Sequence, residues 1–189
     1  SIENLFVAEA YSGTRDYPGL RWHGGPLYAF PQQNLYAVGV AAVALGIGRA
    51  MLANFMELAA DKTPRGLARL ADTESIQGGV ARGEATLGAA RAYLLEALAE
   101  VYAAANETDP MPVPDRARVR LAATHAIHGA SDVTDWVYKA AGVSAIFPGT
   151  PFERRFRDMH TLTQQIQARG SHYETAGQVL LGRPPEIYL

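Results

Sequence analysis

Helical periodicity over long stretches constrains the fold of this chain more than any other feature. Apolar residues recur at three- and four-residue steps over residues 32–61, about 72–105 and about 115–141. Proline and glycine interrupt the pattern between these stretches, and a fourth helical pattern runs over 151–169. Helices of this length with short connections bury their apolar faces against one another. The sequence therefore predicts an all-α fold, an antiparallel four-helix bundle.

The N-terminal segment differs from the helical part of the chain. Residues 1–31 hold many glycines, prolines and aromatic residues with little periodicity, apart from the apolar run 5–7, which suits the end of a strand. We expect residues 1–31 to be an irregular connector from an upstream β-domain that this chain lacks. Residues 32–189 are expected to form one helical bundle domain.

Local signals predict where two helices end or begin. Gly142 is expected to end the third helix. Ser171 and Glu174 have the spacing of a capping box, in which each side chain bonds the other's backbone amide. This spacing predicts a short C-terminal helix that runs to Leu181.

The apolar faces predict which side of each helix is buried. The face of the third helix consists of Val119, Ala122, Ala126, Ala130, Val133, Val137 and Ala140. The face predicted for the first helix consists of Leu35, Val38, Ala42, Leu45, Arg49, Leu52, Met56 and Ala59. Arg49 interrupts this stripe. It either extends to the surface or pairs with a carboxylate or an anionic ligand between helices.

The composition excludes several classes of protein. The chain has 189 residues, no cysteine and a formal net charge of −2, so it lacks a disulfide framework, a thiolate metal site and the clustered positive charge of nucleic-acid-binding proteins. Its longest uncharged apolar run, 35–48, is short of the roughly 20 residues that a membrane span requires. We therefore expect a cytoplasmic protein that binds neither nucleic acid nor a membrane.

One face of the third helix carries four residues that could bind a metal ion, His125, His128, Asp132 and Asp135. Di-metal bundles use Glu-x-x-His pairs from several helices, and this sequence contains no such pair. We therefore predict no metal site, and interpret these residues as a polar stripe that faces solvent or another subunit.

The fourth helix carries the densest set of hydrogen-bonding and titratable side chains beside an apolar stripe, among them Arg157, Asp158, His160, Gln164 and Gln165. His160 is either a satisfied structural residue or a group that faces a ligand. Arg157 and Asp158 are adjacent and point in different directions, so each is expected to pair with a neighbouring helix. The sequence contains no glycine-rich phosphate loop and no nucleophilic serine elbow.

Three segments resemble the C-terminal helical domain of the acyl-CoA dehydrogenase superfamily. Residues 5–9 resemble the end of the strand that leaves the family's central β-domain, and residues 35–49 resemble its first C-terminal helix. Residues 151–161 resemble its last conserved helix, whose hallmark is an Arg-Asp pair, here Arg157 and Asp158. The likeness spans almost the whole chain and is nearer to the two-component flavin-dependent monooxygenases than to the dehydrogenases.

The resemblance implies a parent enzyme in which this bundle follows an N-terminal helical domain and a β-barrel. It implies a homo-oligomer, a dimer or tetramer assembled through the bundle, with reduced flavin (FAD or FMN) between the β-domain and the bundles of two subunits. A separate flavin reductase would supply that flavin. The cofactor-binding residues implied by the resemblance are Arg65, Gln77, Arg157 and Gln164, with Arg65 in place of the family's flavin-contacting arginine.

Two positions depart from the family pattern. The dehydrogenases can keep a catalytic glutamate eight residues after the Asp of the Arg-Asp pair, where this chain has Ile166. Many of the monooxygenases keep a histidine one position earlier, where this chain has Gln165. Glutamine can donate a hydrogen bond but cannot carry a proton at neutral pH. The catalytic candidates are therefore His160 and Gln165.

The preferred interpretation is the C-terminal bundle of a flavin-dependent oxidoreductase, a two-component monooxygenase that uses reduced flavin and oxygen. One alternative is an acyl-CoA dehydrogenase-like enzyme with its base elsewhere, and another is a non-catalytic helical oligomerisation module. Because the implied flavin site needs the other domains, this chain alone is expected to be inactive.

Overall fold

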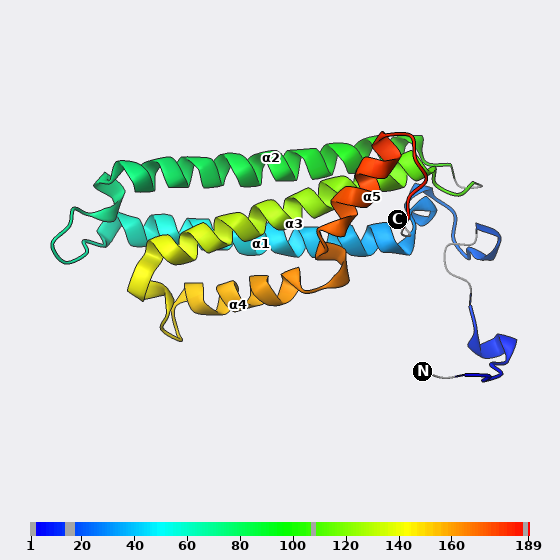
Figure 1. The fold of residues 1–189 in the computed structure, drawn as a ribbon, viewed down its shortest axis with the longest axis horizontal. Helices are drawn as coiled ribbons and strands as arrows, with labels where there is room; N and C mark the ends of the chain where they lie inside the picture. Colours follow the sequence, from blue (N-terminus) through cyan, green and yellow to red (C-terminus); the bar gives the residue numbers. More distant parts are fainter. Residues whose placement is uncertain (1–2, 14–17, 107–108, 187–188) are drawn as a thin grey trace.

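The chain folds into α-helices joined by short turns (Figure 1). The computed structural model describes residues 3–13, 18–106, 109–186 and 189. These residues contain the α-helices α1 (Gln32–Asp61), α2 (Glu74–Ala104), α3 (Val113–Ala141), α4 (Pro151–Thr163) and α5 (Ser171–Leu180). The all-α prediction is confirmed, and the bounds of α1, α2 and α3 lie within two residues of those predicted.

Helix α3 occupies the middle of the bundle. It packs against α1, α2, α4 and α5, and its contact with α1 is the most extensive between helices of the described chain. Figure 1 shows that α1 to α4 alternate in direction, with α4 along the side of the bundle away from α2 and α5 crossing the N-terminal part of α3. This arrangement brings the segment after α4 against both α3 and α5.

The buried face of α1 differs from the predicted one. Its buried residues are Asn34, Ala37, Ala41, Ala44, Gly48, Met51, Leu52, Phe55 and Ala59. Of the predicted stripe, this set contains Leu52 and Ala59, while Met56 is exposed. Because α1 is apolar on most sides, periodicity does not select its buried face. The face of small residues is buried because it allows α3 to come close: a Cβ added at Gly48 would lie 3.2 Å from the carbonyl oxygen of Ala130.

The buried face of α3 is the predicted one. Val119, Ala122, Ala126, Ala130, Val133 and Val137 are all buried, and Ala140 is half-buried. Gly142 follows the helix with a positive φ of 56°, a conformation that favours glycine, so its predicted role as the C-terminal stop is confirmed.

Arg49 pairs with Glu84 of α2. Both alternatives for Arg49 therefore hold, because its side chain extends to the surface and also forms an interhelix ion pair. Both side chains are nearly half exposed, so solvent screens the pair and it adds little to stability.

One side of α1 is apolar yet exposed, and we call it the outer face of α1. Its large apolar side chains are Leu35, Tyr36, Val43 and Met56. By length and composition α1 could also cross a membrane, a test that core helices of bundles pass too, and 33% of its most apolar window is buried. An exposed apolar face of this kind is typical of a surface that another protein or a membrane covers.

The N-terminal segment is irregular, with short 3₁₀ turns at Glu9–Tyr11, Pro18–Leu20 and Pro26–Ala29. Residues 5–7, which resemble the end of a strand, form no strand in the described part of the chain, and the Phe6 side chain is 89% exposed. A strand needs a neighbouring strand for its hydrogen bonds, and the described residues provide none. An upstream β-domain stays a prediction.

Helix α4 is shorter than predicted, because it ends at Thr163 and not at residue 169. Gln165 has extended backbone angles, and a 3₁₀ turn follows at Ile166–Ala168. The capping box predicted for α5 does not form: Gly170 is the N-cap, and no side chain caps the helix. The segment between α4 and α5 is thus a tight turn, and we call residues 164–168 the α4–α5 turn.

Candidate functional site

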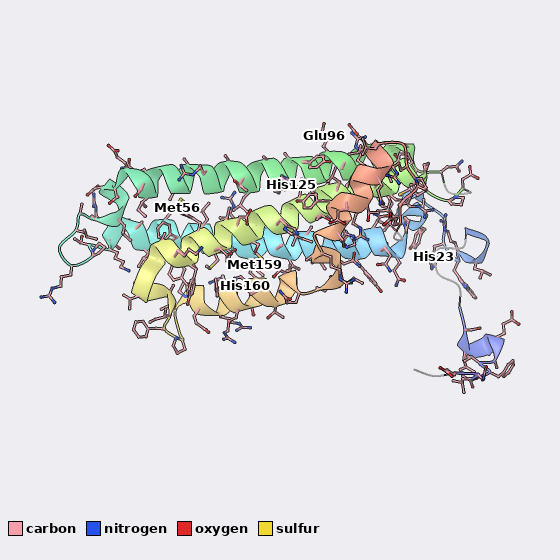
Figure 2. All side chains as sticks on the ribbon, viewed as in Figure 1. His23, Met56, Glu96, His125, Met159 and His160 are labelled. Carbon is pink, nitrogen blue, oxygen red and sulfur yellow. The ribbon has the colours of Figure 1, made fainter. Side chains whose placement is uncertain are left out.

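Helix α4 carries a row of polar side chains along the bundle surface. Pro151 begins the helix at a position where the missing N–H of proline is not needed. Phe152 and Met159 are its buried residues, and Figure 2 shows Met159 on the side that faces the rest of the bundle. These two anchors fix which side chains of α4 remain at the surface.

His160 connects α4 to α3. Its Nε2 atom lies 2.9 Å from Oδ1 of Asp135. Its ring lies 4.2 Å from that of Phe156, which in turn stacks on Tyr138 with 3.9 Å between ring centroids. These contacts are what a structural histidine would make. A catalytic role for His160 stays a prediction.

Arg157 and Asp158 pair along α4 and not with neighbouring helices, so that prediction is wrong. Arg157 donates to Glu153 through Nε and Nη2, and Asp158 lies 3.7 Å from Arg154. Residues four apart on an exposed helix face are neighbours, which favours such pairs. Hydrogen bonding between them lowers the pKa of Glu153 and raises the pKa of Arg157. The guanidinium that was predicted to bind cofactor is thus held by Glu153.

The α4–α5 turn presents three consecutive exposed residues, Gln164, Gln165 and Ile166. The Oε1 atom of Gln165 accepts a hydrogen bond from the backbone N–H of Gln167 at 2.6 Å. The side chain is therefore held in place, and its amide nitrogen is directed elsewhere as a donor. A fixed donor beside an apolar side chain can orient a planar ligand, but a carboxamide cannot transfer a proton at neutral pH.

Two histidines hold the backbone of this turn. His172 Nε2 lies 2.9 Å from the carbonyl oxygen of Ile166, and His128 Nε2 lies 2.9 Å from that of Ala168. Because both acceptors are carbonyl oxygens, each ring carries a proton on Nε2. Side chains of α5 and α3 thus hold the backbone of the turn after α4 has ended at Thr163.

A buried arginine beneath the turn was not apparent from the sequence. Arg120 of α3 is 1% exposed, and it donates to Oε1 of Gln167 and, at 3.2 Å, to the carbonyl oxygen of Gln33. Burial lowers the pKa of Arg120 to about 10, so the guanidinium stays charged at neutral pH. No feature of the sequence marks it, because Arg116 and Arg118 lie close to it on the same helix.

The stability of the α4–α5 turn and α5 is expected to fall as the pH drops below 6.5, the ordinary pKa of histidine. Burial lowers the pKa of His172 in the folded protein, and the charges of Arg120 and Arg169 lower it further. Above the unfolded-state pKa, His172 is neutral in both the folded and the unfolded protein, and its contribution to stability is complete. As the pH falls through the lowered folded-state pKa, the unfolded chain binds the proton more readily and the stability is lost.

Urea unfolding at about pH 8 and about pH 5, on either side of the ordinary histidine pKa, measures this loss. His172→Gln keeps a donor at the position of Nε2 but does not titrate, so its stability should depend less on pH than that of wild type. His23→Gln, which removes an exposed histidine of the connector, should leave the pH dependence unchanged. The same pH dependence in wild type and His172→Gln would contradict the prediction.

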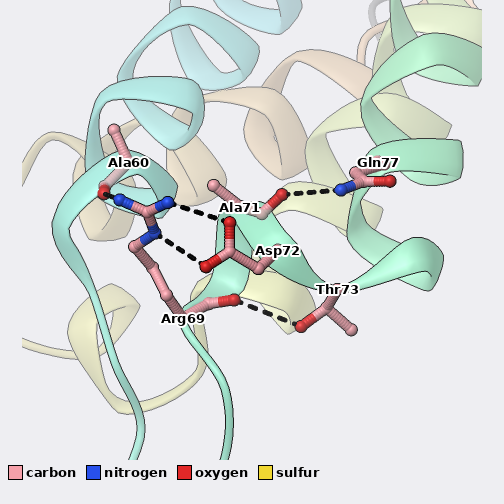
Figure 3. Close-up of polar contacts among 6 residues, drawn as sticks. All are labelled: Ala60, Arg69, Ala71, Asp72, Thr73 and Gln77. Atoms are coloured by element: carbon pink, nitrogen blue, oxygen red, sulfur yellow. Dashed lines mark hydrogen bonds and ion pairs between the residues drawn. The ribbon is translucent and has the colours of Figure 1, made fainter.

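Of the other predicted cofactor residues, Arg65 lies in the connection between α1 and α2, and Gln77 lies in the first turn of α2 beside it (Figure 3). Arg69 holds this loop by donating to both carboxylate oxygens of Asp72, at 3.1 and 2.9 Å. Gln77 donates from Nε2 to the carbonyl oxygen of Ala71 at 2.9 Å (Figure 3). Arg65 is exposed on the loop. The Gln77 amide therefore supports the loop, and both candidates are exposed.

The structure separates the predicted site residues into two groups. The loop between α1 and α2 lies at one end of the bundle, and the end of α4 lies away from it (Figure 1). Within one copy of the chain, Arg65 and Gln77 are therefore apart from Gln164 and Gln165. The α4–α5 turn is the place where sequence-predicted residues come together.

The polar stripe on α3 does not gather into a metal cluster within the described residues. His125 packs edge-on against Tyr93 of α2, with 6.1 Å between ring centroids. His128 is engaged with the α4–α5 turn, and Asp135 with His160. The stripe thus supplies separate contacts to α2, α4 and the turn.

Comparison with known proteins shows matches along nearly the whole chain. The family described as acyl-CoA dehydrogenase, C-terminal domain, matches residues 38–169. The chain is 28% identical to the indole-3-acetate monooxygenase of Pseudomonas putida over 97% of its own length and 47% of that protein. It is 25% identical to the pigment production hydroxylase of Rhodococcus erythropolis over 85% of its length and 41% of that protein. The chain therefore spans less than half the length of these relatives.

Solved structures share the fold. XiaF from Streptomyces sp., in complex with FADH2 and glycerol, matches 96% of this chain and 46% of that chain with a TM-score of 0.80 at 21% identity. The 3-HSA hydroxylase from Rhodococcus sp. RHA1 matches 86% of this chain and 42% of that chain with a TM-score of 0.76, also at 21% identity. These matches confirm the helical fold predicted from the sequence.

Proposed function

The chain belongs to the acyl-CoA dehydrogenase C-terminal domain family, and on this premise we propose that it is the helical part of a two-component flavin-dependent monooxygenase. The observation that carries the proposal is the 28% identity to indole-3-acetate monooxygenase over 97% of the chain. The α4–α5 turn supports it, because Ile166 provides no carboxylate base at the position where the dehydrogenase resemblance would place one.

The residues of the turn fit the edge of a flavin ring. That edge carries carbonyl oxygens and ring nitrogens on a planar, largely apolar body. Gln164 and Gln165 can donate to it and accept from it, and the exposed Ile166 side chain offers apolar contact. At the end of the bundle, Arg65 offers a positive charge to a phosphate of FAD or FMN. Since these two groups are apart in one chain, we place the flavin between two subunits.

Bound reduced flavin supplies the two electrons with which molecular oxygen gives one atom to a substrate and the other to water. The residues of this chain would hold the flavin and orient it. Gln165, fixed by the N–H of Gln167, would donate from Nε2 to the ring edge of the bound flavin. The hydrogen bond between Nε2 of His160 and Oδ1 of Asp135 keeps α4 in place on α3.

Anaerobic titration of the full-length protein with reduced FAD and with reduced FMN tests the proposal, followed by mixing with oxygen. We expect reduced flavin to bind. In Gln165→Ala we expect it to be reoxidised about threefold to tenfold faster, because the ring edge loses one hydrogen bond. Gln178→Ala, a matched change on α5, should behave like wild type. Absence of flavin binding by wild type would contradict both enzyme readings and favour a non-catalytic helical module.

Addition of an acyl-CoA to the oxidised protein separates the monooxygenase from an acyl-CoA dehydrogenase-like enzyme. A dehydrogenase needs a base to remove the α-proton of the acyl group, and Ile166 cannot act as one. We therefore expect the absorbance of oxidised flavin to be unchanged by the acyl-CoA. Bleaching of the flavin would favour the dehydrogenase-like alternative.

We further propose a separate flavin reductase as a partner and a homo-oligomer, a dimer or tetramer, assembled through the bundle. The outer face of α1 supports this assembly, because its exposed Leu35, Val43 and Met56 need a covering surface. Sedimentation of the full-length protein gives the number of subunits.

A further inference from the structure

The geometry points to Arg120 as a positioning residue for Gln165, acting through Gln167. The inference has a structural part, that Arg120 holds the α4–α5 turn. Its functional part, that this hold governs the flavin contact of Gln165, rests on the proposed function.

Gln167 is the residue at which the turn meets the interior of the bundle. Its side chain is 3% exposed, with Oε1 accepting from Arg120 and Nε2 donating to Oε1 of Gln33 at 2.9 Å. Its backbone N–H donates to Oε1 of Gln165 at 2.6 Å. A change in the orientation of Gln167 therefore changes the group that holds the Gln165 side chain.

The surroundings of Arg120 are not those of a residue in a stabilising ion pair. Its hydrogen-bond acceptors, Oε1 of Gln167 and the carbonyl oxygen of Gln33, are neutral, and its Nε atom has no partner among the described residues. Burial of a charge with incomplete hydrogen bonding costs free energy relative to an apolar side chain. Stability alone therefore does not account for an arginine here. The planar guanidinium does provide donors in a rigid fork, which can link α1 and the turn to α3 at once.

The two histidines do not hold the Gln167 side chain. His172 and His128 bind the carbonyl oxygens of Ile166 and Ala168, so they hold the backbone on either side of Gln167. Neither contacts the Gln167 side chain through these bonds. Arg120 and Gln33 hold that side chain, which anchors residue 167 and with it the backbone N–H that holds Gln165.

Amide hydrogen exchange of the full-length protein tests the structural part without any flavin. In Arg120→Met the Gln167 amide is expected to exchange at least about tenfold faster, because a charge-assisted hydrogen bond to its side chain is lost. Arg118→Met is the matched control on α3, since Arg118 pairs with Glu100 and not with the turn. Arg120→Lys keeps the charge without the fork and should give an intermediate rate, which also covers the case in which Arg120→Met does not fold. Equal exchange in the Arg120 variants and Arg118→Met would overturn the inference.

A double-mutant cycle with Gln165→Ala tests the functional part, with the reoxidation rate of bound reduced flavin as the readout. Arg120→Met should speed reoxidation in the wild-type background but change it by less than about twofold when residue 165 is already alanine. Independent effects that simply multiply would show that Arg120 acts on general stability, and would overturn the positioning role. Absence of flavin binding by wild type would overturn the proposed function instead, and the exchange measurement would still decide whether Arg120 holds the turn.

Discussion

Replacement of Met159 with alanine is expected to lower the free energy of unfolding by about 2–5 kcal/mol. Met159 is fully buried, and with Phe152 it makes up the buried anchors of α4. Its loss leaves a cavity between α4 and the bundle, so the helix and the turn that follows it should loosen together. Urea unfolding followed by circular dichroism measures the change.

Arg154→Ala is the matched control for this prediction. It lies on the same helix, its side chain is 82% exposed, and its removal should change the free energy of unfolding by less than about 0.5 kcal/mol. A loss below about 1 kcal/mol in Met159→Ala would mean that α4 is not packed through this residue, and that the position of the candidate site is not fixed by the core.

Replacement of Gly79 with alanine is expected to destabilise the bundle by about 1–3 kcal/mol, although alanine is the better helix former. A Cβ at Gly79 would lie 1.9 Å from Cζ2 of Trp136 on α3. The indole cannot retreat inward without moving Phe55, which is fully buried and packs edge-on against it with 5.2 Å between ring centroids. Either the ring turns outward or α2 and α3 move apart.

Gly88→Ala on the same helix should change the free energy of unfolding in the opposite direction. No atom lies within 4 Å of a Cβ added there, so the change should stabilise the bundle by up to about 1 kcal/mol through helix propensity alone. Urea unfolding measures both variants. Trp136 fluorescence reports any movement of the ring, best in a Trp22→Phe background because the 96% exposed Trp22 adds signal from solvent. A neutral or stabilising Gly79→Ala would contradict the close approach of α2 and α3.

Two helices show how far the sequence could predict the fold. The buried face of α3 was predicted because charged and polar residues mark its other sides. The face of α1 was not, because α1 is apolar around most of its circumference and the buried side is chosen by how closely α3 can approach at Gly48. Local periodicity carries no information on that approach, which depends on a helix far away in the sequence.

Only part of the candidate site could be predicted from the sequence, again because the rest depends on elements far away in the sequence. Gln165 and Ile166 were singled out by the family resemblance, counted from Arg157 and Asp158, and their roles stay predictions. The early end of α4 was not predicted, because the turn that follows it is held by His128 of α3, far away in the sequence, and by His172 of α5. Arg120 lies among other arginines on α3, and its burial shows only once α1, α3 and the α4–α5 turn are assembled.

The packing of α1 mainly on α3 has a consequence for the order of synthesis. Helix α1 is complete at Asp61, but α3 is complete only at Ala141, 80 residues later. At typical rates of about 5–20 residues per second, the ribosome needs about 4–16 s to make that stretch. Throughout this interval the most apolar helix of the described chain has left, or is leaving, the ribosome without its principal partner. Among the described helices, we therefore expect nascent α1 to have the greatest need of a chaperone.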